Sequence, residues 1–315
     1  MQVLKPADLP DNFTRSLYKI APYRGCGHGC RYCDGRAERY YVEGDFEKDI
    51  VIRDDIPELL AVDLPKVRER GFVAFGSGTT DPYQPIEATR NITGRCAALL
   101  VAQAGAAAHS RKAGEGPFAL PAMVMTKSAL ALRDLPLWAR VNAASGFLLM
   151  VSITSLDEEL RMAMEPGASS FEERLSLLKS FKEAGCAVGA LAMPFLPGLS
   201  DSEESIRALY EAVSAIGVDF VMAGGVTLRP GRQKDFYLKA LASYRPGLLE
   251  STTALFTNEK ESGSPWSSAS NSLRARIARV SRDFDLPWLL PHAVYSRILP
   301  AHGGHGWTKA RLRQA

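Results

Sequence analysis

Short apolar runs alternate with amphipathic stretches along this chain, and this rhythm restricts its fold more than any other feature. Six runs have the length and composition of strands, at residues 17–22, 72–75, 122–126, 147–154, 188–193 and 218–222. Their apolar residues follow one another without alternation, as in strands that are covered on both faces. Helical stretches between such strands are typical of a parallel sheet with helical crossovers. We therefore predict an α/β fold.

Two of the crossover helices have recognisable ends. The residues Ser-Phe-Glu-Glu at 170–173 form a capping box, and Gly185 ends the helix that follows. The residues Ser-Asp-Ser-Glu at 200–203 repeat the pattern before a second helix that ends at Gly217. Two successive crossovers of this kind support the parallel arrangement.

Other segments are read from composition. Residues 105–121 are rich in Ala, Gly, His and Lys and are expected to be a surface excursion, and residues 257–271 are expected to be a long mobile loop. The lone cysteines Cys96 and Cys186 fall on apolar stretches and are expected to be buried small hydrophobic residues.

Three cysteines lie within eight residues, at Cys26, Cys30 and Cys33. A 4Fe–4S cluster normally takes four cysteine ligands, so three would leave one iron open for a small molecule. This pattern is the signature of enzymes that reduce S-adenosylmethionine (SAM) and generate a 5′-deoxyadenosyl radical. A structural zinc site with His28 as fourth ligand is the main alternative, but closed zinc sites usually pair two short cysteine knuckles, and no second one exists here.

Further site candidates come from the ends of the predicted strands, where barrels of parallel strands carry their active sites. Tyr32, just before the third cysteine, is placed to support the adenine of SAM. Lys127 follows the third strand and could pair with the SAM carboxylate or be a solvated rim residue. Ser152 and Thr154 end the fourth strand and offer hydroxyls to the ribose.

The charge is unevenly distributed along the 315 residues. Residues 1–224 hold 24 basic and 29 acidic side chains, whereas residues 225–315 hold 14 basic and six acidic ones, a net charge of +8. We predict a core barrel over 1–224 and a basic, mostly helical C-terminal extension over 225–315. The basic extension is either a footprint for nucleic acid phosphates or a solvated helical face with a tail.

The sequence also predicts where in the cell the protein is found. No basic stretch followed by an apolar run opens the chain, and no apolar run reaches the roughly 18 residues of a membrane span. Five cysteines, three of them in one loop, suit a reducing compartment. We expect a cytoplasmic protein with no membrane association.

The motifs together resemble the spore photoproduct lyase-like (DNA repair photolyase-like) branch of radical SAM proteins, over about residues 18–229. The resemblance rests on the cysteine loop, the Ser-Gly-Thr-Thr-Asp-Pro run at 77–82, Lys127, and the Glu-Pro-Gly run at 165–167 with the helix after it. It implies a partial (β/α)6 TIM-like barrel, a 4Fe–4S cluster on the three cysteines, SAM as oxidant and an electron donor of the flavodoxin or ferredoxin type. It also implies that Thr80, Lys127 and Ser152 contact SAM.

The chain departs from the thymine-dimer lyase of that branch at the positions of its hydrogen-transfer residues. Gly78 stands where the lyase has its hydrogen-donating cysteine, and Asp34 stands where it has a tyrosine of the radical relay. Tyr83 is a candidate replacement donor. We therefore do not predict thymine-dimer repair by the cysteine route.

Three functional hypotheses remain at this point. The first is a radical SAM enzyme that acts on a nucleic acid or nucleotide. The second is a radical SAM enzyme that acts on a peptide or small metabolite. The third is a catalytically silent iron–sulfur or zinc protein.

Overall fold

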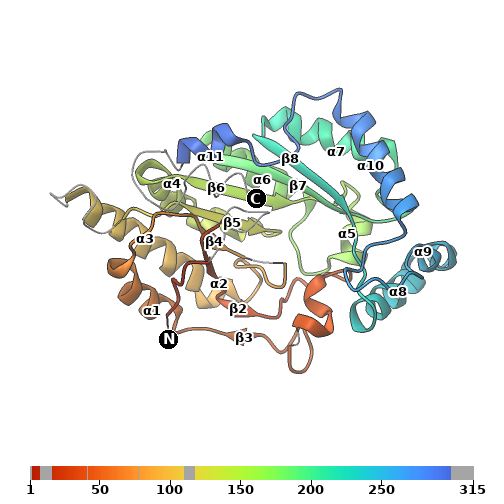
Figure 1. Cartoon of the computed structure of the whole chain (residues 1–315), viewed down its shortest axis with the longest axis horizontal. Helices are drawn as coiled ribbons and strands as arrows, with labels where there is room; N and C mark the ends of the chain where they lie inside the picture. Colours follow the sequence, from red (N-terminus) through yellow and green to blue (C-terminus); the bar gives the residue numbers. More distant parts are fainter. Residues whose placement is uncertain (1, 8–15, 41, 77, 110–117, 299–315) are drawn as a thin grey trace.

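A six-stranded parallel sheet forms the centre of the molecule (Figure 1). The computed structural model describes residues 2–7, 16–40, 42–76, 78–109 and 118–298. The strands of the sheet follow chain order: β1 (Tyr18–Ile20), β4 (Val73–Phe75), β5 (Ala122–Thr126), β6 (Phe147–Ser152), β7 (Ala187–Phe195) and β8 (Phe220–Gly225). All neighbouring pairs are parallel. The predicted α/β fold with six strands in sequence is confirmed.

The helices connect the strands and continue beyond the last of them. They are α1 (Ile56–Asp63), α2 (Glu87–Arg90), α3 (Ile92–His109), α4 (Leu135–Ala144), α5 (Glu158–Met164), α6 (Phe171–Glu183), α7 (Glu203–Ile216), α8 (Arg232–Tyr244), α9 (Leu249–Leu255), α10 (Ser267–Ser281) and α11 (His292–Ile298). Five short 3₁₀ helices, at residues 34–36, 38–40, 64–66, 129–134 and 246–248, complete the described elements. None of the helices in the described ranges is long and apolar enough to cross a membrane.

Apolar side chains cover both faces of the sheet, because successive residues of a strand point to opposite sides. One face, with Val124 and Leu149, packs against the crossover helices in the largest core cluster. The other face carries Met123, Leu148 and Phe220, and it is covered in part by Tyr295 of α11. This explains why the strand sequences show continuous apolar runs rather than alternation.

The helix ends follow the predictions with one correction. The Ser170–Glu173 capping box is present at the start of α6. The second helix, α7, is instead capped by Ser202, whose side chain accepts the backbone N–H of Ser205. Ser200 lies two residues earlier and its hydroxyl accepts the N–H of Leu196, so it shapes the preceding turn and does not cap the helix. Gly217 ends α7 with a left-handed φ of 75°, as its lack of a side chain allows.

Two loop predictions also need correction. Residues 267–271 of the expected mobile loop begin α10, whose Leu273 and Ile277 pack against the main core. Residues 105–109 of the expected surface excursion belong to α3, and residues 110–117 lie outside the described part of the chain. Cys96 and Cys186 are buried, as predicted.

The segment that carries the three cysteines leaves the sheet after β1 and is closed by a small strand pair. Strands β2 (Tyr23–Arg24) and β3 (Val51–Ile52) pair antiparallel, so the intervening residues form a loop held at its base. The C-terminal helices pack on this region: Tyr237 and Leu241 of α8 share an apolar cluster with Cys30 and Tyr32. In Figure 1, α5, α8 and α9 lie together at one end of the sheet. The boundary predicted between residues 224 and 225 remains a prediction; it falls at the last residue of β8.

Candidate active site

A pocket of about 430 Å³ opens between the cysteine loop and the C-terminal ends of the strands. Cysteine-loop residues form one wall, and the ends of β5, β6, β7 and β8 form the other. Seven of the residues singled out from the sequence line it: Cys26, Cys30, Tyr32, Cys33, Thr80, Lys127 and Ser152. Residues more than a hundred positions apart therefore meet at one site, as expected where parallel strands end at the same edge.

The three cysteine thiols converge on this pocket. Burial, with a smaller contribution from neighbouring thiols and carboxylates, raises the pKa of Cys30 to about 12 and that of Cys26 well above its usual range. Burial likewise raises the pKa of Cys33. Thiols in such a place become thiolates when metal cations supply the opposing charge. Two buried cysteines and a partly buried one, lining a cavity of this size, therefore fit a metal cluster.

Lys127 brings a positive charge into the same pocket. Its Nζ lies 5.8 Å from the centre of the Tyr32 ring, and no carboxylate of the described residues is within ion-pair distance of it. Burial acts to lower the pKa of Lys127, but the Cys30 thiol and the Glu165 carboxylate together raise it above its usual value. The ammonium group is therefore retained and is available to an incoming anion.

Thr80 supports the cysteine loop. Its hydroxyl donates to the carbonyl oxygen of Gly25 at 2.8 Å and accepts a hydrogen bond from the side-chain amide of Gln84 at 3.2 Å. The same amide nitrogen donates to the Gly25 carbonyl, and the Gln84 side-chain oxygen accepts the N–H of Gly27 at 2.7 Å. The loop after β4 thus fixes the backbone at the entry to the cysteine segment.

Asp81, next in the chain, joins three parts of the site. Its carboxylate accepts the Thr126 hydroxyl and the Lys127 N–H, both at 2.8 Å, and lies 3.2 Å from Nε2 of His28. Burial would raise the pKa of Asp81, but the neighbouring His28 and these hydrogen bonds bring it below its usual value. A negative Asp81 holds the end of β5 beside the cysteine loop.

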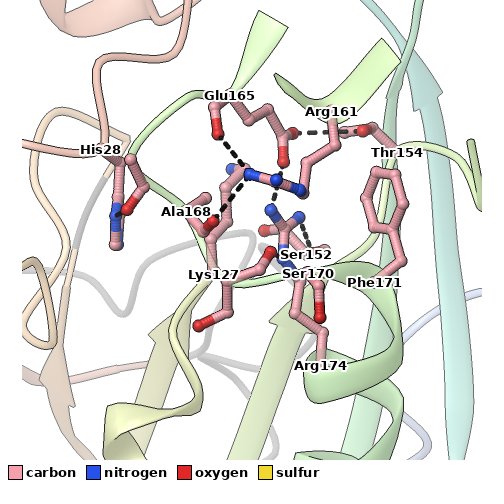
Figure 2. A network of polar contacts seen from close by, with 12 residues as sticks. His28, Lys127, Ser152, Thr154, Arg161, Glu165, Ala168, Ser170, Phe171 and Arg174 are labelled. Carbon is pink, nitrogen blue, oxygen red and sulfur yellow. Dashed lines mark hydrogen bonds and ion pairs between the residues drawn. The ribbon is translucent and has the colours of Figure 1, made fainter. Parts of the chain in front are cut away.

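A buried ion pair lies under the pocket (Figure 2). Nη2 of Arg174 is 2.5 Å from Oε2 of Glu165, and both side chains are fully enclosed, with 0% exposure. Oε1 of Glu165 accepts the hydroxyls of Tyr32 and, at 3.1 Å, Thr154. Burial would raise the pKa of Glu165, but the charges of Arg174 and Lys127 bring it below its usual value.

The backbone around this carboxylate is tied to the cysteine loop. The N–H of Arg31 donates to the Met164 carbonyl at 2.8 Å, and the N–H of Gly167 donates to the His28 carbonyl at 2.9 Å. Nδ1 of His28 in turn donates to the Gly167 carbonyl at 2.8 Å. A Cβ at Gly167 would lie 2.4 Å from the Gly27 carbonyl oxygen, so only glycine permits this approach.

Tyr83 does not join the pocket. It is fully buried among the crossover helices, where its hydroxyl donates to Asp134 at 3.0 Å and accepts the indole N–H of Trp138 at 2.7 Å. The expectation that Tyr83 replaces a hydrogen donor is therefore corrected, because the chain turns its side chain away from the cavity after Pro82. Gly78 and Asp34 do line the pocket, and Asp34 accepts hydrogen bonds from Thr227 and Gln233.

A second cavity, of about 560 Å³, adjoins the first. The two cavities share Gly225, the last residue of β8, and the two residues after it, Val226 and Thr227. The walls of the second cavity come from α9 and α10, and they carry several hydroxyl groups together with Arg274 and Arg276. Space for a further molecule therefore exists beside the cysteine-lined pocket.

Four basic residues of the C-terminal region form ion pairs among the described residues. Arg276 contacts Asp201 at 2.6 Å, and Arg279 contacts Glu203 at the start of α7. Lys234 pairs with Glu259, and Arg245 pairs with Glu159 at 3.3 Å. Part of the positive charge counted in the sequence is thus neutralised by acidic partners, which weakens its interpretation as a nucleic acid footprint.

Several residues of the site were not identified from the sequence. The sequence shows Glu165 only as the first residue of a Glu-Pro-Gly run, whereas the structure encloses it. The sequence places Arg174 only on the helix that follows, and it carries no signal for Gln233. Gln233 of α8 donates to the Tyr32 carbonyl and to Asp34, both at 2.9 Å. The only sequence feature that draws attention to Arg174 is its position as a charged residue on the helix that the capping box predicts.

Comparisons with known proteins agree with this geometry. The sequence matches the Radical SAM superfamily over residues 20–210. It is 32% identical over 244 residues to an uncharacterised protein of Mycobacterium tuberculosis (strain ATCC 25618 / H37Rv), covering 76% of this chain and 67% of that protein. It is 25% identical over 195 residues to an uncharacterised protein of Methanocaldococcus jannaschii, covering 62% of this chain and 66% of that one.

The fold is also similar to solved structures. A mutant of spore photoproduct lyase with bound AdoMet and dinucleoside spore photoproduct has a TM-score of 0.61 at 17% sequence identity, covering 90% of this chain and 76% of that one. This likeness concerns the fold, and it confirms the expected partial barrel. The family match spans more than half of the chain and includes the cysteine loop. The chain therefore belongs to the radical SAM superfamily of enzymes, whose cofactors are a 4Fe–4S cluster and S-adenosylmethionine.

Proposed function

We propose that this chain reductively cleaves SAM at a 4Fe–4S cluster bound by Cys26, Cys30 and Cys33. The observation that carries the proposal is the meeting of these three thiols with Lys127 in one pocket. Three cysteines provide one ligand fewer than a cluster of this type normally has, which leaves a position for the methionine end of SAM. When bound, the cluster supplies the electron that cleaves SAM to methionine and a 5′-deoxyadenosyl radical.

The side chains of the pocket divide the binding of SAM among them. Lys127 pairs with the carboxylate of SAM, since its ammonium group is enclosed and lacks a carboxylate partner among the described residues. The ring of Tyr32 supports the adenine, and the Ser152 hydroxyl faces the ribose. Thr80, whose hydroxyl donates to the Gly25 carbonyl, contributes by holding the cysteine loop. In a cofactor enzyme this orientation and the exclusion of water are the protein's share of the work.

The electron is proposed to come from a flavodoxin or ferredoxin. For the substrate, the second cavity favours a nucleotide-sized molecule over a long nucleic acid. Its 560 Å³ lies within the usual range for small-molecule sites, roughly 300–1,000 Å³. The paired arginines of α10 leave less free positive charge for a phosphate backbone than the sequence count indicates. A small metabolite is the second candidate, and the same cavity supports it.

The test of SAM cleavage is an anaerobic reaction of the reconstituted protein. We expect about four irons and four sulfides per chain, and formation of 5′-deoxyadenosine from SAM after reduction with dithionite or reduced flavodoxin. Protein that binds a single zinc ion, or that binds the cluster and forms no 5′-deoxyadenosine, would contradict the proposal. Cys96→Ala is the control for loss of a buried cysteine, because Cys96 lies in α3 away from the pocket.

The test of substrate class compares effectors in the same reaction. Nucleoside monophosphates are expected to change the rate of 5′-deoxyadenosine formation, whereas oligonucleotides of about 20 residues have no larger effect at equal nucleotide concentration, because the cavity admits one unit. A rate that responds only to the oligonucleotide would favour a polymer substrate. A rate that responds to neither, but to a mixture of small cell metabolites, would favour the second candidate.

A further inference from the structure

The buried pair of Glu165 and Arg174 has a role that reaches beyond folding. We propose that this pair is a positioning device for SAM: it sets the Tyr32 ring and the end of β6, and it keeps Lys127 available for the SAM carboxylate. The inference rests on the proposed function, because it assigns the pocket to SAM. Neither residue is proposed to touch the reacting atoms.

The first step of the argument concerns Tyr32. The Tyr32 hydroxyl donates to Oε1 of Glu165, and Gln233 donates to the Tyr32 backbone carbonyl at 2.9 Å. Hydrogen bonds therefore hold Tyr32 at two points, the hydroxyl at the end of its side chain and its backbone carbonyl. Tyr32 lies between Cys30 and Cys33, so a shift of its ring is also a shift of the cysteine loop. Glu165 thus links the orientation of the aromatic wall to the position of the thiols.

The second step concerns Ser152. Nη1 of Arg174 donates to the carbonyl oxygen of Ser152 at 3.0 Å, and Nε donates to that of Ser169 at 2.9 Å. The fixed fork of the guanidinium group therefore holds the end of β6 and the segment before α6 in one geometry. Figure 2 shows Arg174 between Glu165 and Ser152.

The third step concerns charge. Nζ of Lys127 lies 5.8 Å from the centre of the Tyr32 ring, whose hydroxyl donates to Glu165, so the ammonium group and the carboxylate occupy the same part of the site (Figure 2). A buried carboxylate needs a nearby cation to balance its charge. Arg174 balances the charge of Glu165 at Oε2, and the Tyr32 and Thr154 hydroxyls occupy Oε1, so the carboxylate is satisfied without Lys127. Arg174 thereby prevents an internal ion pair that would compete with SAM.

The chain offers a matched control for this experiment. Glu87 is also fully buried, accepts a tyrosine hydroxyl from Tyr23, and pairs with Arg133 at 2.9 Å. It differs in location, since its remaining hydrogen bonds are to the N-terminal N–H groups of α3 and it lies outside the pocket. Glu87→Gln therefore removes the same kind of buried charge without touching the proposed SAM contacts.

The experiment measures SAM binding by equilibrium dialysis on the reconstituted, oxidised proteins, together with the SAM-induced change in the electron paramagnetic resonance spectrum of the reduced cluster. Glu165→Gln is expected to weaken SAM binding about 10- to 100-fold, the usual effect of removing a partner that orients a binding group. Its iron content is expected to match that of the unsubstituted protein. Glu87→Gln is expected to lower the melting temperature while leaving SAM affinity and the spectral change unaltered.

A second variant covers the case in which Glu165→Gln does not fold. Tyr32→Phe removes only the hydroxyl, and it is expected to weaken SAM binding in the same direction. Where both fold, the double variant is expected to bind SAM no more weakly than Glu165→Gln alone, since the two side chains act through one hydrogen bond. Unchanged SAM affinity in both single variants, or an equal loss in Glu87→Gln, would overturn the inference. An unsubstituted protein that binds no SAM would instead overturn the proposed function.

Discussion

Basic side chains occupy two contrasting regions of this molecule, the cysteine-lined pocket and the outer face of α10. In the pocket, Lys127 is largely enclosed and has no carboxylate at ion-pair distance among the residues described. On α10, Arg276 is partly buried and Arg279 is exposed, and each is paired with an acidic residue around the start of α7. We propose that the same charge binds a ligand in one region, whereas it pairs a helix with its neighbour in the other.

The difference teaches that burial and partners, rather than the number of charges, decide what a basic residue does. A surface ion pair is screened and contributes little free energy, about 0–1 kcal/mol. An enclosed ammonium group without a carboxylate partner interacts more strongly with an anion that enters, because the local dielectric constant is low. The following variants test whether basic residues in the pocket and on α10 differ in this way.

The largest effect is expected from the cysteines of the pocket. Cys30→Ala is expected to abolish the brown colour of the reconstituted protein and all formation of 5′-deoxyadenosine, while the far-ultraviolet circular dichroism spectrum keeps its shape. Iron and sulfide analysis measures the loss. Retention of a full complement of iron in this variant would show that Cys30 is not a ligand.

A smaller effect is expected from the lysine of the pocket. Lys127→Ala is expected to weaken SAM binding about 10- to 100-fold, since a hydrogen bond to a charged group contributes about 1.5–3 kcal/mol. The cluster content is expected to be unchanged. Lys182→Ala is the matched control, because Nζ of Lys182 pairs with Asp219 at 2.9 Å on the helical side of the sheet. SAM affinity that is equal in the two variants would place Lys127 with the solvated residues.

The paired arginines of α10, Arg276 and Arg279, are expected to affect stability and not SAM binding. Arg276→Ala is expected to lower the free energy of unfolding by about 1 kcal/mol, because Nε also donates to the Asp201 carbonyl at 2.7 Å. Arg279→Ala, at a more exposed pair, is expected to cost less than about 0.5 kcal/mol. Urea denaturation measures both. A marked loss of SAM binding in either variant would erase the distinction between the two regions.

The smallest effect is expected for nucleic acid. A protein that binds through many free phosphate contacts loses affinity steeply with salt. Since Arg276 and Arg279 of α10 are engaged with Asp201 and Glu203, we expect weak binding of an oligonucleotide and a shallow slope of log K against log salt concentration. Fluorescence anisotropy at several salt concentrations checks this. A steep slope would restore the nucleic acid footprint inferred from the net charge.

Local pattern was sufficient for much of the fold. The strand positions could be predicted because buried parallel strands have continuous apolar runs, and α6 because its capping box uses residues three positions apart. The start of α7 was assigned to Ser200 instead of Ser202, since both serines fit a cap and only the path of the preceding turn separates them. Residues 267–271 were mistaken for loop because their polar composition hid the burial of the helix face that follows.

For the site, the rule that active sites lie at the C-terminal ends of parallel strands predicted Lys127 and Ser152 near the cysteines. The structure shows these residues lining one pocket. The rule could not place Tyr83, because adjacency to a motif does not determine which way a side chain points. Nor could it find Glu165 and Arg174 as a pair: a glutamate in a turn and an arginine on a helix are ordinary until the fold encloses both.

The sequence by itself determined the order of strands, the three-cysteine loop and the superfamily, because these depend on residue types at short, fixed spacings. Only the tertiary structure decided which charged side chains are enclosed and which form ion pairs with residues distant in the chain. It also placed the two cavities next to each other. Burial and long-range pairing depend on how distant segments pack, and that information is not contained in any local stretch of residues.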